Sequence, residues 1–145
     1  MTLPKSLVQQ NLHKVTPDTK VHEAAALMFR EDIGALIVEK EGKLVGLLSE
    51  RDLMNRLLVG RLRPQETLVG DIMSTRLVTI KKEETVKQAL QLMSTFHIRH
   101  IPVVDENQTP IAMLSFRDLF ALRLEQLEQE NETIASLVKT DTPGG

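Results

Sequence analysis

The chain has 145 residues, of which 41% are hydrophobic, so it can form one compact domain with an apolar core and is not expected to be disordered. It has no cysteine, which excludes disulfide bonds and thiolate metal sites and fits a reducing compartment, by default the cytoplasm. The formal net charge is −2 with acidic and basic residues interspersed, so no broad basic surface for nucleic acid is expected.

The first residues, MTLPKSLVQQNLHK, lack the apolar stretch of a secretory signal. No later run reaches the roughly 18 apolar residues that a membrane helix needs. We therefore expect a soluble protein with no membrane partner.

From Leu12 onward the chain repeats itself. A shift of 65 positions pairs apolar residues of two copies: Leu12 with Leu77, Val21 with Val86, Ala24 with Ala89, Met28 with Met93, Ile33 with Ile98 and Val38 with Val103. One extra residue in the second copy changes the shift to 66, which pairs Leu48, Ser49, Arg51, Asp52 and Leu53 with Leu114, Ser115, Arg117, Asp118 and Leu119. This regularity indicates an internal duplication.

Each copy is predicted to form a strand, a helix, a two-stranded hairpin and a second helix. Apolar residues at helical spacing predict the first helix, and Thr85 and Gln88 have the form of a capping box at its start in the second copy. Short β-rich runs predict hairpins at 35–39 with 44–48, and at 101–104 with 111–114. The Gly- and Pro-containing stretch 60–66 predicts a surface connection between the copies.

Each unit alone has one apolar face and too few residues for a core, so the two units are expected to stack as one pseudo-two-fold domain. The predicted fold is α+β, with two tandem β-α-β-β-α repeats and a long C-terminal helix. The predicted boundaries are an N-terminal segment 1–11, a first repeat 12–59, a linker 60–70, a second repeat 71–124, a helical extension 125–138 and a flexible tail 139–145.

The C-terminal helix is predicted to continue to about Val138, because neither Gly nor Pro occurs between Asp118 and Pro143. Apolar residues spaced by four and three positions form a heptad-like stripe with one polar member, Asn131; the stripe comprises Phe120, Leu124, Leu127, Asn131, Ile134 and Val138. Two interpretations remain open at this point: the stripe contacts a second copy, or it packs on its own domain.

Both copies carry a Ser-x-Arg-Asp segment where a strand meets a helix. A helix N-terminus offers unpaired N–H groups and partial positive charge, so the serine hydroxyl and these donors can hold a phosphate. The aspartate three residues on can accept hydrogen bonds from ribose hydroxyls, and the arginine can bind phosphate. The alternative is a simple capping box, in which the serine and the aspartate satisfy only the helix start.

Other chemistries have little support. His97 and His100 are three residues apart but lead into a strand, and no set of four convergent ligands is evident, so no metal site is expected. There is no G-x-G-x-x-G, P-loop or G-x-S-x-G motif. Catalytic residues are therefore not assigned, and the protein is not expected to be an enzyme.

At these segments the sequence resembles the paired repeat first named from cystathionine β-synthase, known as the CBS pair or Bateman module. The resemblance covers roughly residues 12–124 and is carried by DTKVHEAAALM and IGALIVEKEGKLVGLLSERD in the first copy and by VTIKKEETVKQALQLM, IRHIPVVDENQ and AMLSFRD in the second. The chain is most similar to the small bacterial type that is little more than one CBS pair with a helical tail.

The resemblance implies two ligand-binding clefts between the repeats. The better-equipped cleft is expected to be lined by Ser115, Asp118, Arg117, His100, Ile101, Pro102, Thr19 and Ala24. The weaker cleft is expected to be lined by Ser49, Asp52, Arg51, Ala35, Leu36, Ile37, Thr79, Glu84 and Ala89. It is expected to be weaker because it has Ala35 where the other has His100, and acidic Glu84 where the other has Thr19.

The resemblance also implies a non-catalytic, nucleotide-sensing role. The expected ligand is an adenine nucleotide, AMP first, with ATP, ADP and NAD as alternatives. A homodimer and an unidentified target protein are the expected partners. The alternative function is a ligand-free assembly protein that acts through its C-terminal helix.

Overall fold

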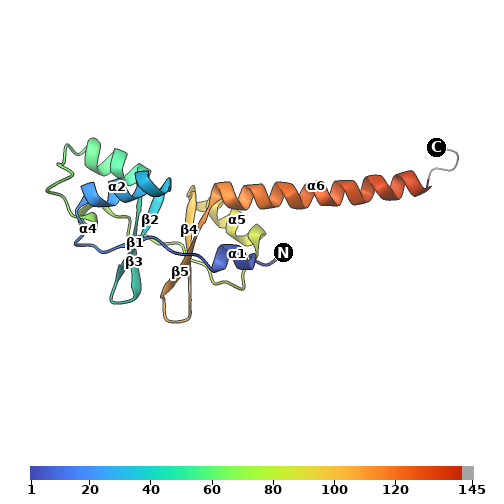
Figure 1. The fold of residues 1–145 in the computed structure, drawn as a ribbon, viewed down its shortest axis with the longest axis horizontal. Helices are drawn as coiled ribbons and strands as arrows, with labels where there is room; N and C mark the ends of the chain where they lie inside the picture. The colour runs from blue at the N-terminus through green and yellow to red at the C-terminus, as the bar shows by residue number, and fades with distance from the viewer. Residues whose placement is uncertain (142–145) are drawn as a thin grey trace.

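The structure is a computed structural model that describes residues 1–141, with side chains described up to residue 137. It consists of two lobes, each with a small β-sheet and a covering helix, and of one long helix that projects beyond the second lobe (Figure 1). The predicted α+β architecture with two tandem repeats and a long C-terminal helix is confirmed.

The first lobe contains a three-stranded sheet of order β1-β2-β3, in which β1 runs parallel and β3 antiparallel to β2. Its elements are β1 (Lys14–Val15), α2 (Val21–Glu31), β2 (Ala35–Lys40), β3 (Lys43–Ser49), α3 (Glu50–Asp52) and the π-helix η1 (Leu53–Leu58). The predicted hairpin is present, and its turn uses the positive φ angles of Glu41 and Gly42. The predicted second helix is also present, but most of it is wound as a π-helix.

The second lobe has a two-stranded antiparallel sheet. Its elements are α5 (Val86–Phe96), β4 (His100–Val104), β5 (Pro110–Ser115) and α6 (Phe116–Asp141). The first strand predicted for this copy is reduced to one isolated parallel bridge between Ile80 and Val103. The predicted capping box is confirmed, because Thr85 Oγ1 accepts from Gln88 N at 3.1 Å and Gln88 Oε1 accepts from Thr85 N at 2.8 Å.

Each lobe has its own apolar core, and each core is completed by a segment that precedes the other repeat. The helix α1 (Lys5–Val8) and the buried Leu3 pack on the second lobe. The helix α4 (Val69–Ile72) packs on the first lobe through both of its end residues, which are buried. The helix α1 lies in the predicted N-terminal segment 1–11, and α4 crosses the predicted boundary between the linker 60–70 and the second repeat 71–124. The same shift of 65 pairs Leu7 with Ile72.

The first turns of α6 pack on the second lobe through Leu119, which is fully buried, and Leu122. Beyond them the helix extends away from both lobes (Figure 1). It continues to Asp141, three residues past the predicted end at Val138. The remainder of the predicted tail, residues 142–145, lies outside the described residues.

Candidate functional site

Two cavities lie between the lobes, with volumes of about 570 Å³ and about 470 Å³. The larger one, called here the first cavity, adjoins the turn from β5 to α6. The smaller one, the second cavity, adjoins the turn from β3 to α3. Five residues line both cavities and form their common wall: Gly34, Ala35, Glu50, Arg99 and His100.

Strand pairing places the two serines in equivalent positions. Ser49 pairs with Ala35 in the first hairpin, and Ser115 pairs with His100 in the second. Each serine ends its strand and starts a helix. In each lobe the first helical N–H donates across the hairpin, from Glu50 to the Gly34 carbonyl at 3.0 Å and from Phe116 to the Arg99 carbonyl at 2.7 Å. Each turn is therefore anchored to the common wall.

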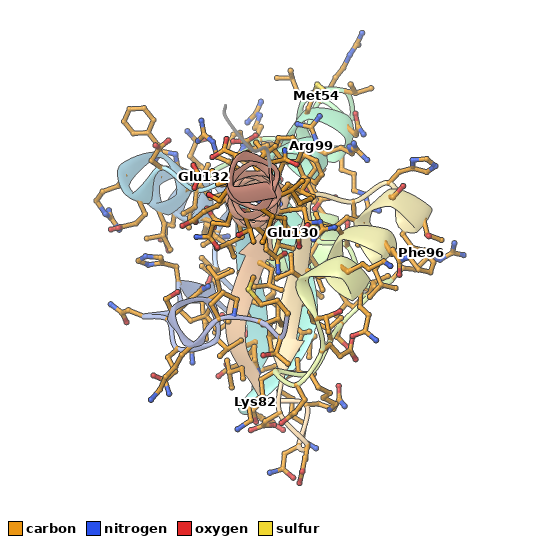
Figure 2. All side chains as sticks on the ribbon, turned by 90° about the vertical axis from the view of Figure 1, so that its right-hand side faces the viewer. Met54, Lys82, Phe96, Arg99, Glu130 and Glu132 are labelled. Carbon is orange, nitrogen blue, oxygen red and sulfur yellow. The ribbon has the colours of Figure 1, made fainter. Side chains whose placement is uncertain are left out.

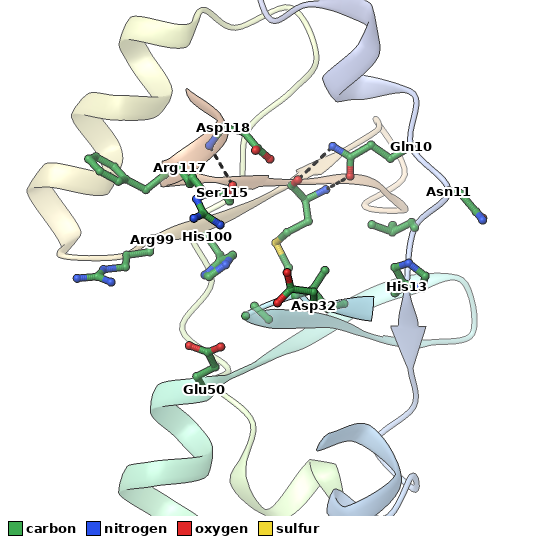
Figure 3. A pocket seen from close by; sticks show the side chains of 16 residues that line it. Gln10, Asn11, His13, Asp32, Glu50, Arg99, His100, Ser115, Arg117 and Asp118 are labelled. Carbon is green, nitrogen blue, oxygen red and sulfur yellow. Dashed lines mark hydrogen bonds between the residues drawn. The ribbon is translucent and has the colours of Figure 1, made fainter. Parts of the chain in front are cut away.

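In the first cavity the turn leaves a carboxylate available. Ser115 Oγ caps α6 by accepting from Asp118 N at 3.2 Å. The Asp118 side chain is exposed, and it accepts no hydrogen bond and forms no ion pair with any residue that the structure describes. Figure 3 shows Ser115, Arg117, Asp118 and His100 on one side of the cavity, with Asp32 and Glu50 on the other. The free carboxylate is thus positioned next to a helix N-terminus and two basic side chains.

In the second cavity the matching carboxylate, that of Asp52, accepts hydrogen bonds from the protein through both of its oxygens. Asp52 Oδ2 accepts from Ser49 N at 2.9 Å, and Ser49 Oγ accepts from Asp52 N at 3.2 Å, which completes the capping box. Asp52 Oδ1 also accepts from Ser74 Oγ at 2.8 Å, and the residue is 6% exposed. The capping-box interpretation therefore describes this copy of the turn in full. In the other copy only the serine cap is present, because Ser115 accepts from Asp118 N but the Asp118 side chain does not accept from Ser115 N.

The balance of charged side chains favours the second cavity over the first for an anionic ligand. Two arginines face three carboxylates in the first cavity: Arg99 and Arg117 with Asp32, Glu50 and Asp118. Three arginines face two carboxylates in the second: Arg51, Arg76 and Arg99 with Glu50 and Asp52. The charge balance of the second cavity is therefore the more favourable one for phosphate, whereas the aspartate of the Ser-x-Arg-Asp turn is available for sugar hydroxyls only in the first.

His100 lies in the common wall and is packed against Gly34. A Cβ atom at Gly34 would lie 3.3 Å from His100 Cε1 and 3.5 Å from Glu50 Cδ, so the glycine makes room for the imidazole ring. Burial lowers the pKa of His100 below its usual value; the Glu50 charge opposes this, Arg99 adds to it, and Asp118 opposes it. The ring is therefore neutral at pH 7 and can gain a proton when an anion approaches.

The structure brings together about half of the residues predicted to bind a ligand. Ser115, Arg117, Asp118 and His100 line the first cavity, and Ser49, Arg51, Asp52 and Ala35 line the second. Ile101, Pro102, Leu36, Ile37, Ala24 and Ala89 line neither cavity and are buried. Thr19 and Glu84 precede α2 and α5, away from both cavities, and Thr79 is adjacent to the lining residue Val78 without lining the cavity itself.

Thr19 and Ala24 lie away from both cavities for a physical reason. Ala24 lies on the face of α2 that packs on its own sheet, and Thr19 Oγ1 accepts from Thr16 N at 3.1 Å within the turn before that helix. The segments that do cross between the lobes are 10–13, at the first cavity, and 74–78, at the second. Gln10 fixes the first of them, because its side chain exchanges two hydrogen bonds of 3.2 Å with the Met113 backbone (Figure 3).

Sequence reasoning missed several polar lining residues. They are Gln10, Asn11, His13, Asp32, Glu50 and Arg99 in the first cavity, and Ser74, Arg76 and His97 in the second. The repeat itself contained a signal for the crossing segments, since the shift of 65 pairs Asn11 with Arg76. Among the residues that the structure describes, no group of three or more His, Cys, Asp or Glu is arranged to hold a metal ion.

The CBS domain family model matches residues 5–59 and 69–125, and the chain belongs to this family. It is 33% identical to the mitochondrial CBS domain-containing protein CBSX3 of Arabidopsis thaliana, over 86% of this chain but 62% of the relative. It is also 33% identical to the CBS domain-containing protein YhcV of Bacillus subtilis, over 82% of this chain and 84% of the relative. The chain thus spans less than two thirds of the plant protein and most of the bacterial one.

Solved structures show the same fold. The CBS domain protein NE2398 has a TM-score of 0.74 and 31% identity, over 79% of this chain and 88% of that chain. The CBS domain pair of protein MJ0100, solved in complex with 5′-methylthioadenosine and S-adenosyl-L-methionine, has a TM-score of 0.74 and 22% identity, over 83% of this chain and 94% of that chain. None of the helices in residues 1–141 combines the length and apolar character required to cross a membrane.

Proposed function

We propose that this protein is a non-catalytic regulatory module that binds an adenine nucleotide between its repeats, AMP first and ATP, ADP or NAD as alternatives, and signals to a partner protein. The observation that carries the proposal is the unpartnered Asp118 carboxylate in the first cavity. Its matched residue, Asp52, is used for structure, so this difference is not explained by helix capping alone.

The ribose and the phosphate of such a ligand each have a suitable partner in the first cavity. Asp118 accepts from the two ribose hydroxyls, which are vicinal donors. Ser115, the N-terminus of the 26-residue helix α6 and Arg117 hold the phosphate. The protein MJ0100, which has the same fold, binds adenosine derivatives, which supports an adenosine moiety as the ligand here.

A thermal-shift series with AMP, ADP, ATP, NAD, adenosine and inorganic phosphate tests the proposal. A ligand at about 100 times its Kd adds about 2.7 kcal/mol to the free energy of unfolding, which raises the Tm by roughly 5–10 °C. We expect this increase with AMP and a smaller one with adenosine. Mass spectrometry of ligand released from the purified protein identifies the physiological nucleotide. The proposal is wrong if no adenine compound raises the Tm at millimolar concentration.

The affinity for AMP is expected to rise as the pH falls from 7.5 to 6. Because burial lowers the pKa of unliganded His100, a nearby phosphate raises that pKa again, so binding takes up a proton. Calorimetric titrations across this range should show an increase of about threefold, since one proton gives at most tenfold per pH unit. His100→Gln should reduce this dependence to the part that comes from the phosphate itself, whose second pKa is about 6, and an unchanged pH profile in that variant would show that another group of the protein takes up the proton.

Without ligand, the sign of the pH effect is reversed. The unfolded chain protonates His100 near pH 6.5, whereas the folded protein resists protonation. The contribution of His100 to stability is therefore complete above that pH and is lost as the pH falls through the lowered pKa of the folded state. Thermal unfolding of the His100→Gln variant provides the reference.

A second candidate function, ligand-free assembly through α6, is favoured by the exposed apolar side chains along that helix. It predicts that removing the residues after Leu124 abolishes oligomerisation, while nucleotides leave the Tm unchanged. The thermal-shift series therefore separates the two functions.

A further inference from the structure

We propose that the projecting part of α6 pairs with the same segment of a second copy as a parallel, in-register two-stranded coiled coil, in which the two Asn131 side chains face each other. This proposal does not depend on nucleotide binding. It rests on the exposed stripe of α6, on the length of helix beyond the lobes, and on the charges beside the stripe.

The stripe does not pack on its own domain. Phe120, Leu124, Leu127 and Ile134 are between 39% and 59% exposed. The face that α6 buries against the second lobe contains Leu119 instead. At 3.6 residues per turn the stripe is centred roughly 100° around the helix from that residue. The stripe is therefore a second apolar face, and nothing within residues 1–137 covers it.

The spacing of the stripe fits a partner helix. The positions alternate by four and three residues, a mean period of about 3.5, which keeps a stripe facing one neighbouring helix along its length. In heptad notation Leu124 and Asn131 occupy a positions, and Leu127 and Ile134 occupy d positions. One asparagine at an a position is the feature that selects two parallel, aligned strands, because its amide finds a partner only in the equivalent residue.

Charges beside the stripe select the parallel orientation. Arg123 lies at a g position and Glu128 at the following e position, and these positions are neighbours across a parallel dimer. Each dimer would gain this pair twice, while Glu130 at the next g position would face Ala135 of the second copy. Figure 2, viewed along the helix, shows Glu130 and Glu132 on different sides of α6. Of the two, only Glu130 flanks the stripe, because Glu132 falls at a b position.

The antiparallel arrangement has two disadvantages. It pairs g with g and e with e positions, which brings Glu130 towards Glu130 and Glu128 towards Glu128 of the second copy. No basic residue lies between Arg123 and residue 138 to offset this repulsion. It also places Asn131 opposite an apolar residue such as Leu127, which leaves a polar amide without a partner. The observations therefore favour a second copy in the parallel direction.

The orientation can be tested by cysteine cross-linking, because the chain has no native cysteine. Ile134→Cys, at a d position, should form a disulfide-linked dimer under mild oxidation, visible as a doubled mass on a non-reducing gel. Ser136→Cys, exposed and outside the stripe, is the matched control and should remain monomeric on the gel. This readout depends on the alignment of the two helices and not on oligomeric state alone, so association of the repeats through another surface does not produce it.

Two outcomes would overturn the proposal. One is equal cross-linking of the two cysteine variants, or none in either. The other is disulfide formation only in a mixture of Leu124→Cys and Ile134→Cys, which indicates antiparallel helices.

A charge exchange provides a second test. Arg123→Glu should weaken the dimer of the full chain about tenfold in analytical ultracentrifugation, and Arg123→Glu with Glu128→Arg should restore it. Absence of rescue in the double variant contradicts the proposed pairing.

Discussion

Asp118→Ala is expected to weaken AMP binding by roughly 10- to 100-fold, because it removes the acceptor for two ribose hydroxyls and a charged hydrogen bond contributes about 1.5–3 kcal/mol. The folded protein should lose little, since this carboxylate accepts no hydrogen bond from the described residues. Its remaining contribution is to the charge at the start of α6, about 0.3–1 kcal/mol. Isothermal calorimetry measures the affinity and thermal unfolding the stability.

The matched control is Glu125→Ala, which removes an exposed carboxylate on the same helix, outside both cavities and outside the apolar stripe. It should leave AMP binding unchanged. Equal AMP affinity in the Asp118→Ala variant and the unchanged protein would remove Asp118 from the binding site and, with it, the main support for the proposed function.

Asp52→Ala, in contrast to Asp118→Ala, should mainly affect stability. It should lower the free energy of unfolding by about 2–3 kcal/mol, equivalent to a fall in Tm of roughly 5–10 °C. Asp52 is buried and accepts hydrogen bonds from Ser49 N at 2.9 Å and Ser74 Oγ at 2.8 Å, so its removal leaves two donors without an acceptor. Chemical denaturation gives the free energy of unfolding directly.

Ser74→Ala separates the two hydrogen bonds of Asp52, because it removes only the bond between the side chains. It should cost about 1 kcal/mol. Equal decreases in Tm for Asp52→Ala and Asp118→Ala would contradict the conclusion that Asp52 stabilises the fold and Asp118 does not.

The repeated architecture could be predicted from the sequence because apolar spacing and turn residues recur at a constant shift. The capping box at Thr85 and both hairpins follow from local chemistry and were confirmed. The missing first strand of the second lobe could not be predicted in this way. Its sequence has the same apolar character, but only Ile80 forms a bridge, with Val103. Strand pairing depends on the geometry of the neighbouring hairpin, which local propensity does not determine.

The predicted residues that line the cavities lie in the Ser-x-Arg-Asp turns or directly across the hairpin from them, as Ala35 and His100 do. Ser115, Arg117 and Asp118 are close together in any structure with this turn, and they line the first cavity. The residues that cross from the other lobe depend on how the lobes stack, so Asn11, which lines the first cavity, was missed, whereas Thr19 lines neither cavity. The distinction between Asp52 and Asp118 depends on Ser74, which is distant in sequence from both.

The absence of any linker between β5 and α6 has a mechanical consequence. Ser115 ends the strand, Phe116 begins the helix and lines the first cavity, and its ring stacks on Phe120 at a centroid distance of 5.5 Å. Because α6 is a continuous rod of 26 residues, about 39 Å long, a tilt of about 5° at its base displaces its tip by about 3 Å. A small change in the angle of α6 at the first cavity would therefore be converted into a larger displacement at the far end of the helix.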